Sequence, residues 1–191
     1  MQYFAFQSYE LGLEAARSRT VGGEHLTLEA FRLLGLDSKL KELGFTGPEL
    51  AAACGSIIGR ACRPGSERAT YDWLLNHSAL GELISYDFEK ISQSRMYQIA
   101  DRLLKHKAEL EDHLAEQERH IFNLEETITL YDLTNTYFEG VSAGNSLASH
   151  GKSKEKRTDC PLVTLAVVMN GQGFIKHSEV FEGNASEAKT L

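Results

Sequence analysis

The apolar pattern of this chain changes its period once, near Asn123, and that change limits the architectures open to it. Before this point, apolar residues recur every three or four positions, as they do on the buried face of a helix. After it, Thr127–Thr134 is rich in β-branched and aromatic residues, which strands favour. We therefore predict an α+β protein, with an all-helical region at residues 1–125 and a β-containing region at residues 126–191.

Short breaks divide the first region into successive helices. Pro48 is suited to the first turn of a helix that runs from Glu49 to about Ala61. Ser66 is a good N-cap for a helix at Glu67–Asn76. The longest periodic segment, Ser92–Asn123, predicts one long amphipathic helix that packs on the preceding helices or on a partner chain.

Three extended segments are predicted after the change of period, at roughly 127–134, 162–169 and 174–181. The second is almost entirely apolar, so we expect it to be buried on both faces. Asn170 to Gly173 form a turn, which makes the second and third segments a β-hairpin. We expect the strand that contains Asp132 to lie at the centre of the sheet, because its apolar residues need cover on both faces.

The charge balance bears on the class of partner. The chain of 191 residues has 20 Lys and Arg against 27 Asp and Glu, a formal net charge of −7. An acidic excess speaks against a dedicated nucleic-acid binder. The positive charges are unevenly placed, however, and local patches rather than the total contact phosphates. One short stretch gathers Lys152, Lys154, Lys156 and Arg157.

The remaining composition points to the cytoplasm. The longest apolar runs are too short to cross a bilayer, and the first residues lack the basic leader of a signal peptide, so we expect no membrane association. Cys54, Cys62 and Cys160 are odd in number and have no CxxC spacing. This argues against a disulfide framework or a zinc ribbon and predicts buried thiols.

Asp132 is the first candidate for a functional residue. An unpaired charge among apolar strand residues is costly, so an arginine, backbone donors or a divalent cation must compensate it. Carboxylate oxygens on neighbouring strands are the ligands that Mg²⁺ requires. The alternative is an aspartate at a strand end that accepts hydrogen bonds from turn amides. For the basic stretch, the alternative to DNA binding is an ordinary solvated loop.

Several segments resemble one family. Leu130–Gly140 is similar to the first-aspartate segment of the DDE transposases of bacterial insertion sequences, in the branch related to the Tn5 enzyme. The similarity covers nearly the whole chain and extends through the further segments Pro64–Thr70, Leu103–Lys107, Gly151–Val163, Gly173–Phe174 and Val180–Asn184.

The resemblance implies a ribonuclease-H-like catalytic domain in which three acidic residues on separate elements hold two divalent ions, Mg²⁺ or Mn²⁺. Such a pair stabilises the attacking and leaving oxygens of an in-line displacement at a phosphodiester. Asp132 alone maps onto this triad, as a metal ligand and catalytic residue. The other two would lie beyond Leu191, so residues 126–191 are expected to be the truncated start of the domain, inactive alone.

The resemblance also implies that the chain binds DNA, both at the element ends and at the target. Lys152, Lys154, Lys156 and Arg157 are then candidate phosphate contacts. Two other classes remain open. One is a non-catalytic helical interaction or regulatory protein that forms a homodimer through its long helix. The other is a metal-dependent nuclease of the same fold without strand transfer.

Overall fold

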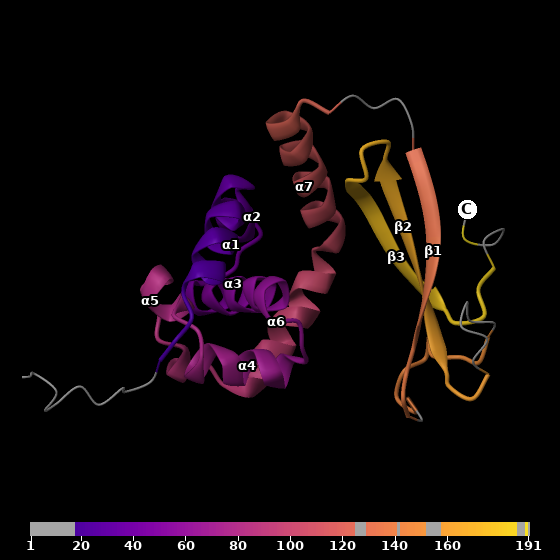
Figure 1. The fold of residues 1–191 in the computed structure, drawn as a ribbon, viewed down its shortest axis with the longest axis horizontal. Coiled ribbons are helices and arrows are strands. Elements are labelled where there is room, and N and C mark those ends of the chain that lie inside the picture. Colours follow the sequence, from indigo (N-terminus) through magenta and orange to yellow (C-terminus); the bar gives the residue numbers. More distant parts are fainter. Residues whose placement is uncertain (1–17, 125–128, 141, 152–157, 187–189, 191) are drawn as a thin grey trace, which may run out of the picture. The chain divides into compact units, whose positions relative to one another are not determined.

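The computed structural model describes residues 18–124, 129–140, 142–151, 158–186 and 190. The chain divides into two compact units, Met1–Leu104 and Lys105–Leu191. The first unit is helical, and the second contains one helix and a three-stranded antiparallel sheet (Figure 1). The predicted α+β class is therefore confirmed, with the helices first in the chain.

The helical unit is built around α3, which packs against α1, α2 and α4. The middle of α3 is buried from Ala51 to Ser56 because alanine, cysteine and glycine let neighbouring helices approach closely. The elements of this unit are α1 (Gly22–Leu33), α2 (Leu36–Glu42), α3 (Gly47–Cys62), α4 (Glu67–Asn76), α5 (Leu80–Ile84), the 3₁₀ helix η1 (Phe88–Lys90) and α6 (Gln93–Lys105).

Local signals in the sequence set several helix ends. The Ser66 side chain accepts a hydrogen bond from the backbone N–H of Ala69, so α4 begins and ends where the N-cap and the apolar spacing predict. Pro48 stands in the first turn of α3. Ahead of it, the backbone N–H and the hydroxyl of Thr46 both donate to the carboxylate of Glu49, at 2.9 and 2.7 Å.

The contact between α3 and α4 requires two glycines. A Cβ at Gly55 would stand 2.9 Å from Leu74 Cδ1, and one at Gly59 would stand 2.6 Å from Thr70 Cγ2. Trp73, which is 4% exposed, lies against the same stretch of α3. The two helices are therefore closer at this point than side chains larger than glycine would allow.

The prediction of one long helix from Ser92 to Asn123 is wrong. Two helices occupy this segment: α6 ends at Lys105, and α7 (Lys107–Phe122) begins after His106. The backbone of His106 is not helical, with φ −103° and ψ 19°. The apolar steps of three and four are interrupted at Lys107, beside the observed break. The helix α7 belongs to the second compact unit, together with the sheet.

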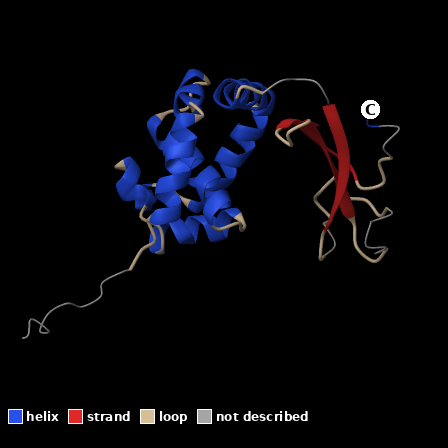
Figure 2. Ribbon diagram, turned by 45° about the horizontal axis from the view of Figure 1, so that its top comes forward, coloured by secondary structure: helices blue, strands red, loops and turns tan. Residues whose placement is uncertain are grey.

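The second unit contains the three predicted strands. They are β1 (Thr129–Tyr137), β2 (Leu162–Asn170) and β3 (Ile175–Glu182), paired antiparallel in the order β1-β2-β3 (Figure 2). The turn of the β2–β3 hairpin is confirmed, since the Asn170 side chain accepts from the N–H groups of Gln172 and Phe174 and Gly173 has φ +89°. In this conformation glycine is the favoured residue.

Within the described residues the strand of Asp132 is at an edge of the sheet, not at its centre as predicted. The central place belongs to β2, the most apolar of the three strands. One face of β2 is buried through Leu162, Thr164 and Ala166, while the other is only half-buried. Full burial on both faces, expected from the apolar run, is therefore reached on one face only.

The helix α7 lies along the outer edge of β3 and runs antiparallel to it. Glu111 Oε1 accepts hydrogen bonds from the backbone N–H and the hydroxyl of Ser178, at 3.2 and 2.5 Å. Lys107, one turn earlier, donates to the backbone carbonyl of Ser178. At the other end of α7, the rings of Phe122 and Phe174 meet at a centroid distance of 5.0 Å. Two helical side chains thus satisfy the outward N–H and C=O of Ser178, which a further strand would otherwise bind.

Candidate functional site

Asp132 lies near the middle of β1 with its side chain exposed. It is paired with Val167 of β2, and Val167 is paired with Ser178 of β3, so these three side chains form one row on the same face of the sheet. Leu130 and Thr134 are its neighbours along the strand on that face. The carboxylate is therefore on an exposed face of the sheet, in one row with Val167 and Ser178.

Acidic companions for Asp132 are distant among the described residues. Glu139 follows the end of β1, and the five residue-to-residue steps from Asp132 to Tyr137 alone span about 16 Å. Across the sheet, Ser178 and the Glu111 carboxylate bound to it are two strand spacings away, about 10 Å. Accordingly, the described part of the chain contains no group of three His, Cys, Asp or Glu residues that could hold a metal ion.

The residues Lys152, Lys154, Lys156 and Arg157 lie outside the described residues, but the chain on either side of them is described. His150 Nδ1 is 3.2 Å from the carbonyl oxygen of Thr158, so the two ends of the basic segment lie side by side. Ser149 and Leu162 exchange backbone hydrogen bonds of 3.1 and 3.0 Å. The described residues on either side of the basic segment therefore meet where β2 begins, beside the end of β1.

Two glycines make this anchorage possible. A Cβ at Gly183 would collide with the carbonyl oxygen of Leu162 and would be 2.5 Å from that of Ser149. A Cβ at Gly151 would in turn collide with the carbonyl oxygen of Gly183. The backbone N–H of Gly183 donates to Leu147 at 3.2 Å. The backbone atoms of these residues are therefore in direct contact beside the basic segment. Both glycines belong to the sequence motifs Gly151–Val163 and Val180–Asn184, on which the family resemblance rests.

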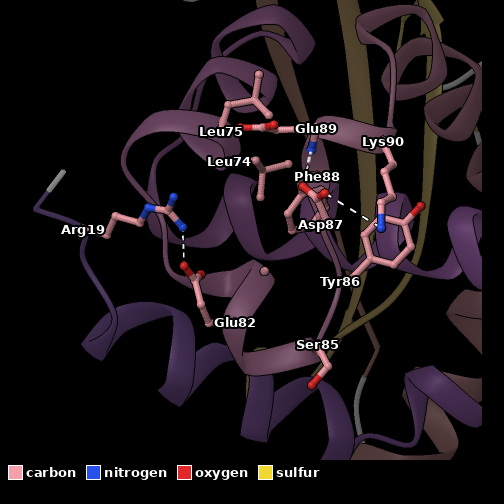
Figure 3. Close-up of a pocket in the computed structure, with 11 residues that line it drawn as sticks. Arg19, Leu74, Leu75, Glu82, Ser85, Tyr86, Asp87, Phe88, Glu89 and Lys90 are labelled. Atoms are coloured by element: carbon pink, nitrogen blue, oxygen red, sulfur yellow. Dashed lines mark hydrogen bonds and ion pairs between the residues drawn. The ribbon is translucent and has the colours of Figure 1, made fainter. Parts of the chain in front are cut away.

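The helical unit contains a shallow hollow of about 450 Å³ (Figure 3). Arg19 forms an ion pair with Glu82 at one side of it, and Lys90 faces Asp87 at 3.9 Å at the other. Both cations at its rim therefore already face a carboxylate. The lining includes Arg19, Leu74, Glu82, Tyr86, Asp87 and Lys90.

The cysteines are free, and Cys54 and Cys160 are buried as predicted, whereas Cys62 is half-buried. Burial raises the pKa of the Cys54 thiol to about 12, so it stays protonated and has no nucleophilic character at neutral pH. Cys62 is 3.4 Å from the hydroxyl of Thr27. Cys160 Sγ is 3.5 Å from the carboxylate of Asp159.

Sequence reasoning did not identify the interactions of Lys107, Glu111 and Ser178. The only local signal is the spacing of four between a lysine and a glutamate on one helix face, which is common on solvent-exposed helices. Their actual partner is a backbone 67 residues away from Glu111 in the sequence. No periodicity could indicate this.

Comparisons with protein-family models, with curated proteins and with solved structures find no match to this chain. None of the described helices has the length and apolar character needed to cross a membrane.

Proposed function

We propose that this chain is part of a protein that acts on DNA through phosphoryl transfer, with its second unit forming the start of a ribonuclease-H-like domain. What supports the class is the order of elements: a strand bearing an aspartate, a following antiparallel hairpin, and Asp132 directed to an open face of the sheet. Within this class, the motifs of Leu130–Gly140 and Val180–Asn184 favour the transposases of insertion sequences.

The single observation that carries the proposal is the distance along β1 between Asp132 and the residues that flank the basic segment. Gly151 and Gly183, which are 32 residues apart and lie in two of the motifs, meet through backbone contacts beside the basic segment. These contacts lie at the end of β1, about 16 Å along the strand from Asp132. At this distance, the four cations could bind DNA phosphates a few nucleotides away from a phosphodiester held at Asp132.

The described residues do not on their own fit a metal site of the two-ion type, because Asp132 has no pair of acidic companions among them. Further carboxylates would have to come from elsewhere. We therefore assign no catalytic step to this chain. Its proposed contribution is one metal ligand, Asp132, and the binding of DNA phosphates by Lys152, Lys154, Lys156 and Arg157.

DNA binding by the 191-residue chain tests the proposal. Its affinity for a fluorescently labelled duplex is measured by anisotropy at several salt concentrations. Replacing Lys152, Lys154, Lys156 and Arg157 with alanine is expected to weaken binding about equally for element-end and random DNA. The slope of log affinity against log salt should fall by about 0.9 for each phosphate that a cation no longer neutralises.

A charge-preserving variant is the matched control. Replacing the three lysines with arginine keeps every positive charge, so the salt slope should stay within error of the wild-type value. Absence of salt-dependent binding in the wild-type chain would contradict the proposal. An unchanged slope in the alanine variant would show that the cluster is a solvated loop.

A second candidate function is a non-catalytic interaction protein. The observation in its favour is that α7, with 16 residues, has none that is fully buried in the described structure. An amphipathic helix with so little cover has surface available for a partner. This function predicts self-association or protein binding without any dependence on the four cations.

A further inference from the structure

Two anchoring side chains lie close together in the sequence, on either side of the break between α6 and α7. The first is Arg102, in the last turn of α6. Its guanidinium forms an ion pair with Glu49 and donates a 2.8 Å hydrogen bond to the backbone carbonyl of Gly44. The same group lies over the ring of Phe45, 4.4 Å from the centroid. The end of α6 is therefore fixed to the helical unit.

The second anchor is Lys107, the first residue of α7. Its ammonium donates to the backbone carbonyl of Ser178 and pairs with the carboxylates of Glu111 and Glu179, at 3.2 and 3.4 Å. One turn later, Glu111 accepts hydrogen bonds from the backbone N–H and the hydroxyl of Ser178. The start of α7 is therefore fixed to β3.

The four residues 103–106 separate the two anchors, and the boundary between the two compact units falls among them, after Leu104. Leu104 is 68% exposed, and Lys105 is exposed as well. His106 stands outside both helices, and its carbonyl accepts the first hydrogen bond of α7, from the N–H of Leu110 at 3.0 Å. Side-chain packing therefore does little to hold the middle of this stretch in one conformation.

The break is not caused by a helix-breaking residue. Sharp changes of direction in helices occur mainly at proline or glycine, and residues 102–108 contain neither. Leucine, lysine and alanine make up most of this stretch, and all three are strong helix formers. Because the local sequence favours a continuous helix, we attribute the non-helical backbone of His106 to the anchors on either side of it.

We propose that residues 103–106 are a hinge, about which the helical unit and the unit that contains α7 and the sheet rotate relative to each other. Hinges are a few residues at the ends of elements that absorb changes of φ and ψ while the parts on either side stay rigid. Here the rigid parts approach within five residues, from Arg102 to Lys107, so the rotation is confined to a short stretch. The proposal does not depend on DNA binding and leaves the role proposed for Asp132 unchanged.

The experiment measures distances between pairs of spin labels in the 191-residue chain by double electron–electron resonance. The labels are attached to an unnatural keto amino acid, which leaves the three native cysteines in place. One reference label is at Ser38 on α2, and the other is at Gln172 in the β2–β3 turn. The two positions that flank the hinge are Asp101 on α6 and Asp112 on α7, and all four positions are exposed.

From Ser38, the distance to Asp101 should have a narrow distribution, and the distance to Asp112 should be about twofold wider because it crosses the hinge. From Gln172 the order should reverse, with a narrow distribution to Asp112 and a wide one to Asp101. Any other pattern would overturn the proposal. Equally narrow distributions would mean a rigid joint, and equally wide ones would place the motion elsewhere.

A substitution at the first anchor tests where the hinge begins. Arg102→Ala removes the contacts with the helical unit, so the backbone amides in the last turn of α6 should exchange with solvent about tenfold faster. Arg95→Ala is the matched control, because Arg95 is on the same helix and only approaches Glu49 to 4.0 Å. It should leave the exchange of that turn unchanged. Equal exchange in the Arg102→Ala variant and wild type would show that α6 is not fixed there, and the hinge would have no defined start.

Discussion

Replacing Gly59 with alanine is expected to destabilise the helical unit, although alanine is the better helix former. The new Cβ would stand 2.6 Å from Thr70 Cγ2 and 3.4 Å from Trp73 Cζ3. Carbon atoms prefer separations of about 3.5–4.0 Å, so the first contact is a severe overlap. Thr70 is only 2% exposed and has little space into which it can move.

The magnitude is a balance of two terms. Alanine in a helix interior gains about 1 kcal/mol over glycine. Forcing an extra carbon into a packed interface costs about 1–3 kcal/mol. The net change in the free energy of unfolding should therefore lie between about zero and 2 kcal/mol of destabilisation.

A second substitution separates the two terms. Thr70→Ala removes Cγ2 together with a buried hydroxyl that has no hydrogen-bond partner among the described groups. In that background the overlap disappears, and Gly59→Ala should become stabilising by about 1 kcal/mol. The double-mutant cycle should thus give a coupling of about 1–3 kcal/mol between the two positions.

Guanidinium unfolding followed by tryptophan fluorescence is the suitable assay. Trp73 is the only tryptophan of the chain and is buried in the interface under test, so it reports the helical unit. Gly47→Ala is the matched control, because it stands in the same helix and a Cβ there meets nothing within 4 Å. If Gly59→Ala has the same effect with and without Thr70→Ala, α3 and α4 do not meet in the way described, and the reasoning fails.

Three further outcomes are expected. Gly183→Ala should loosen the base of the basic segment and raise its rate of proteolysis well above that of Gly144→Ala, where a Cβ has open space; equal rates would contradict the close backbone contact. Hydrogen bonds from Thr46 and the ion pair with Arg102 lower the pKa of Glu49 from 4.5 to about 2, so its stabilising effect is present above pH 4.5 and lost as the pH falls toward 2. Glu49→Gln should remove that part of the pH dependence of unfolding, and an unaltered acid profile would refute it. Finally, the isolated chain should not cleave supercoiled DNA with Mg²⁺ or Mn²⁺, since Asp132 lacks acidic companions among the described residues; cleavage abolished by Asp132→Asn would disprove this.

The sequence predicted those features that depend on short-range chemistry. Ser66 and Pro48 marked helix starts because capping and proline geometry act within one turn. The turn at Asn170–Gly173 was predictable because it needs an amide side chain and a positive φ within four residues. The resulting strands lie within a few residues of their predicted positions.

Features that depend on distant contacts were not predictable in this way. The apolar spacing is interrupted at Lys107 but resumes after it, so the spacing alone does not show that the two helices belong to different compact units. The placement of β1 at an edge depends on which strands are available to pair, and the β-branched composition of Thr129–Tyr137 suits edge and centre alike. The residue pattern of Thr127–Thr134 could place Asp132 within a strand, but it could not predict which other carboxylates lie near it.

The edge position of β1 bears on the proposed metal site. Any strand that brings a carboxylate within a few ångströms of Asp132 must lie beside β1, because the neighbour on the inner side is Val167 of β2. That strand would lie along the outer edge of β1, about 4.8 Å away, and backbone hydrogen bonds would hold it there. Asp132→Asn should therefore remove the proposed metal ligand and leave the strand pairing intact, because the carboxylate takes no part in backbone hydrogen bonds.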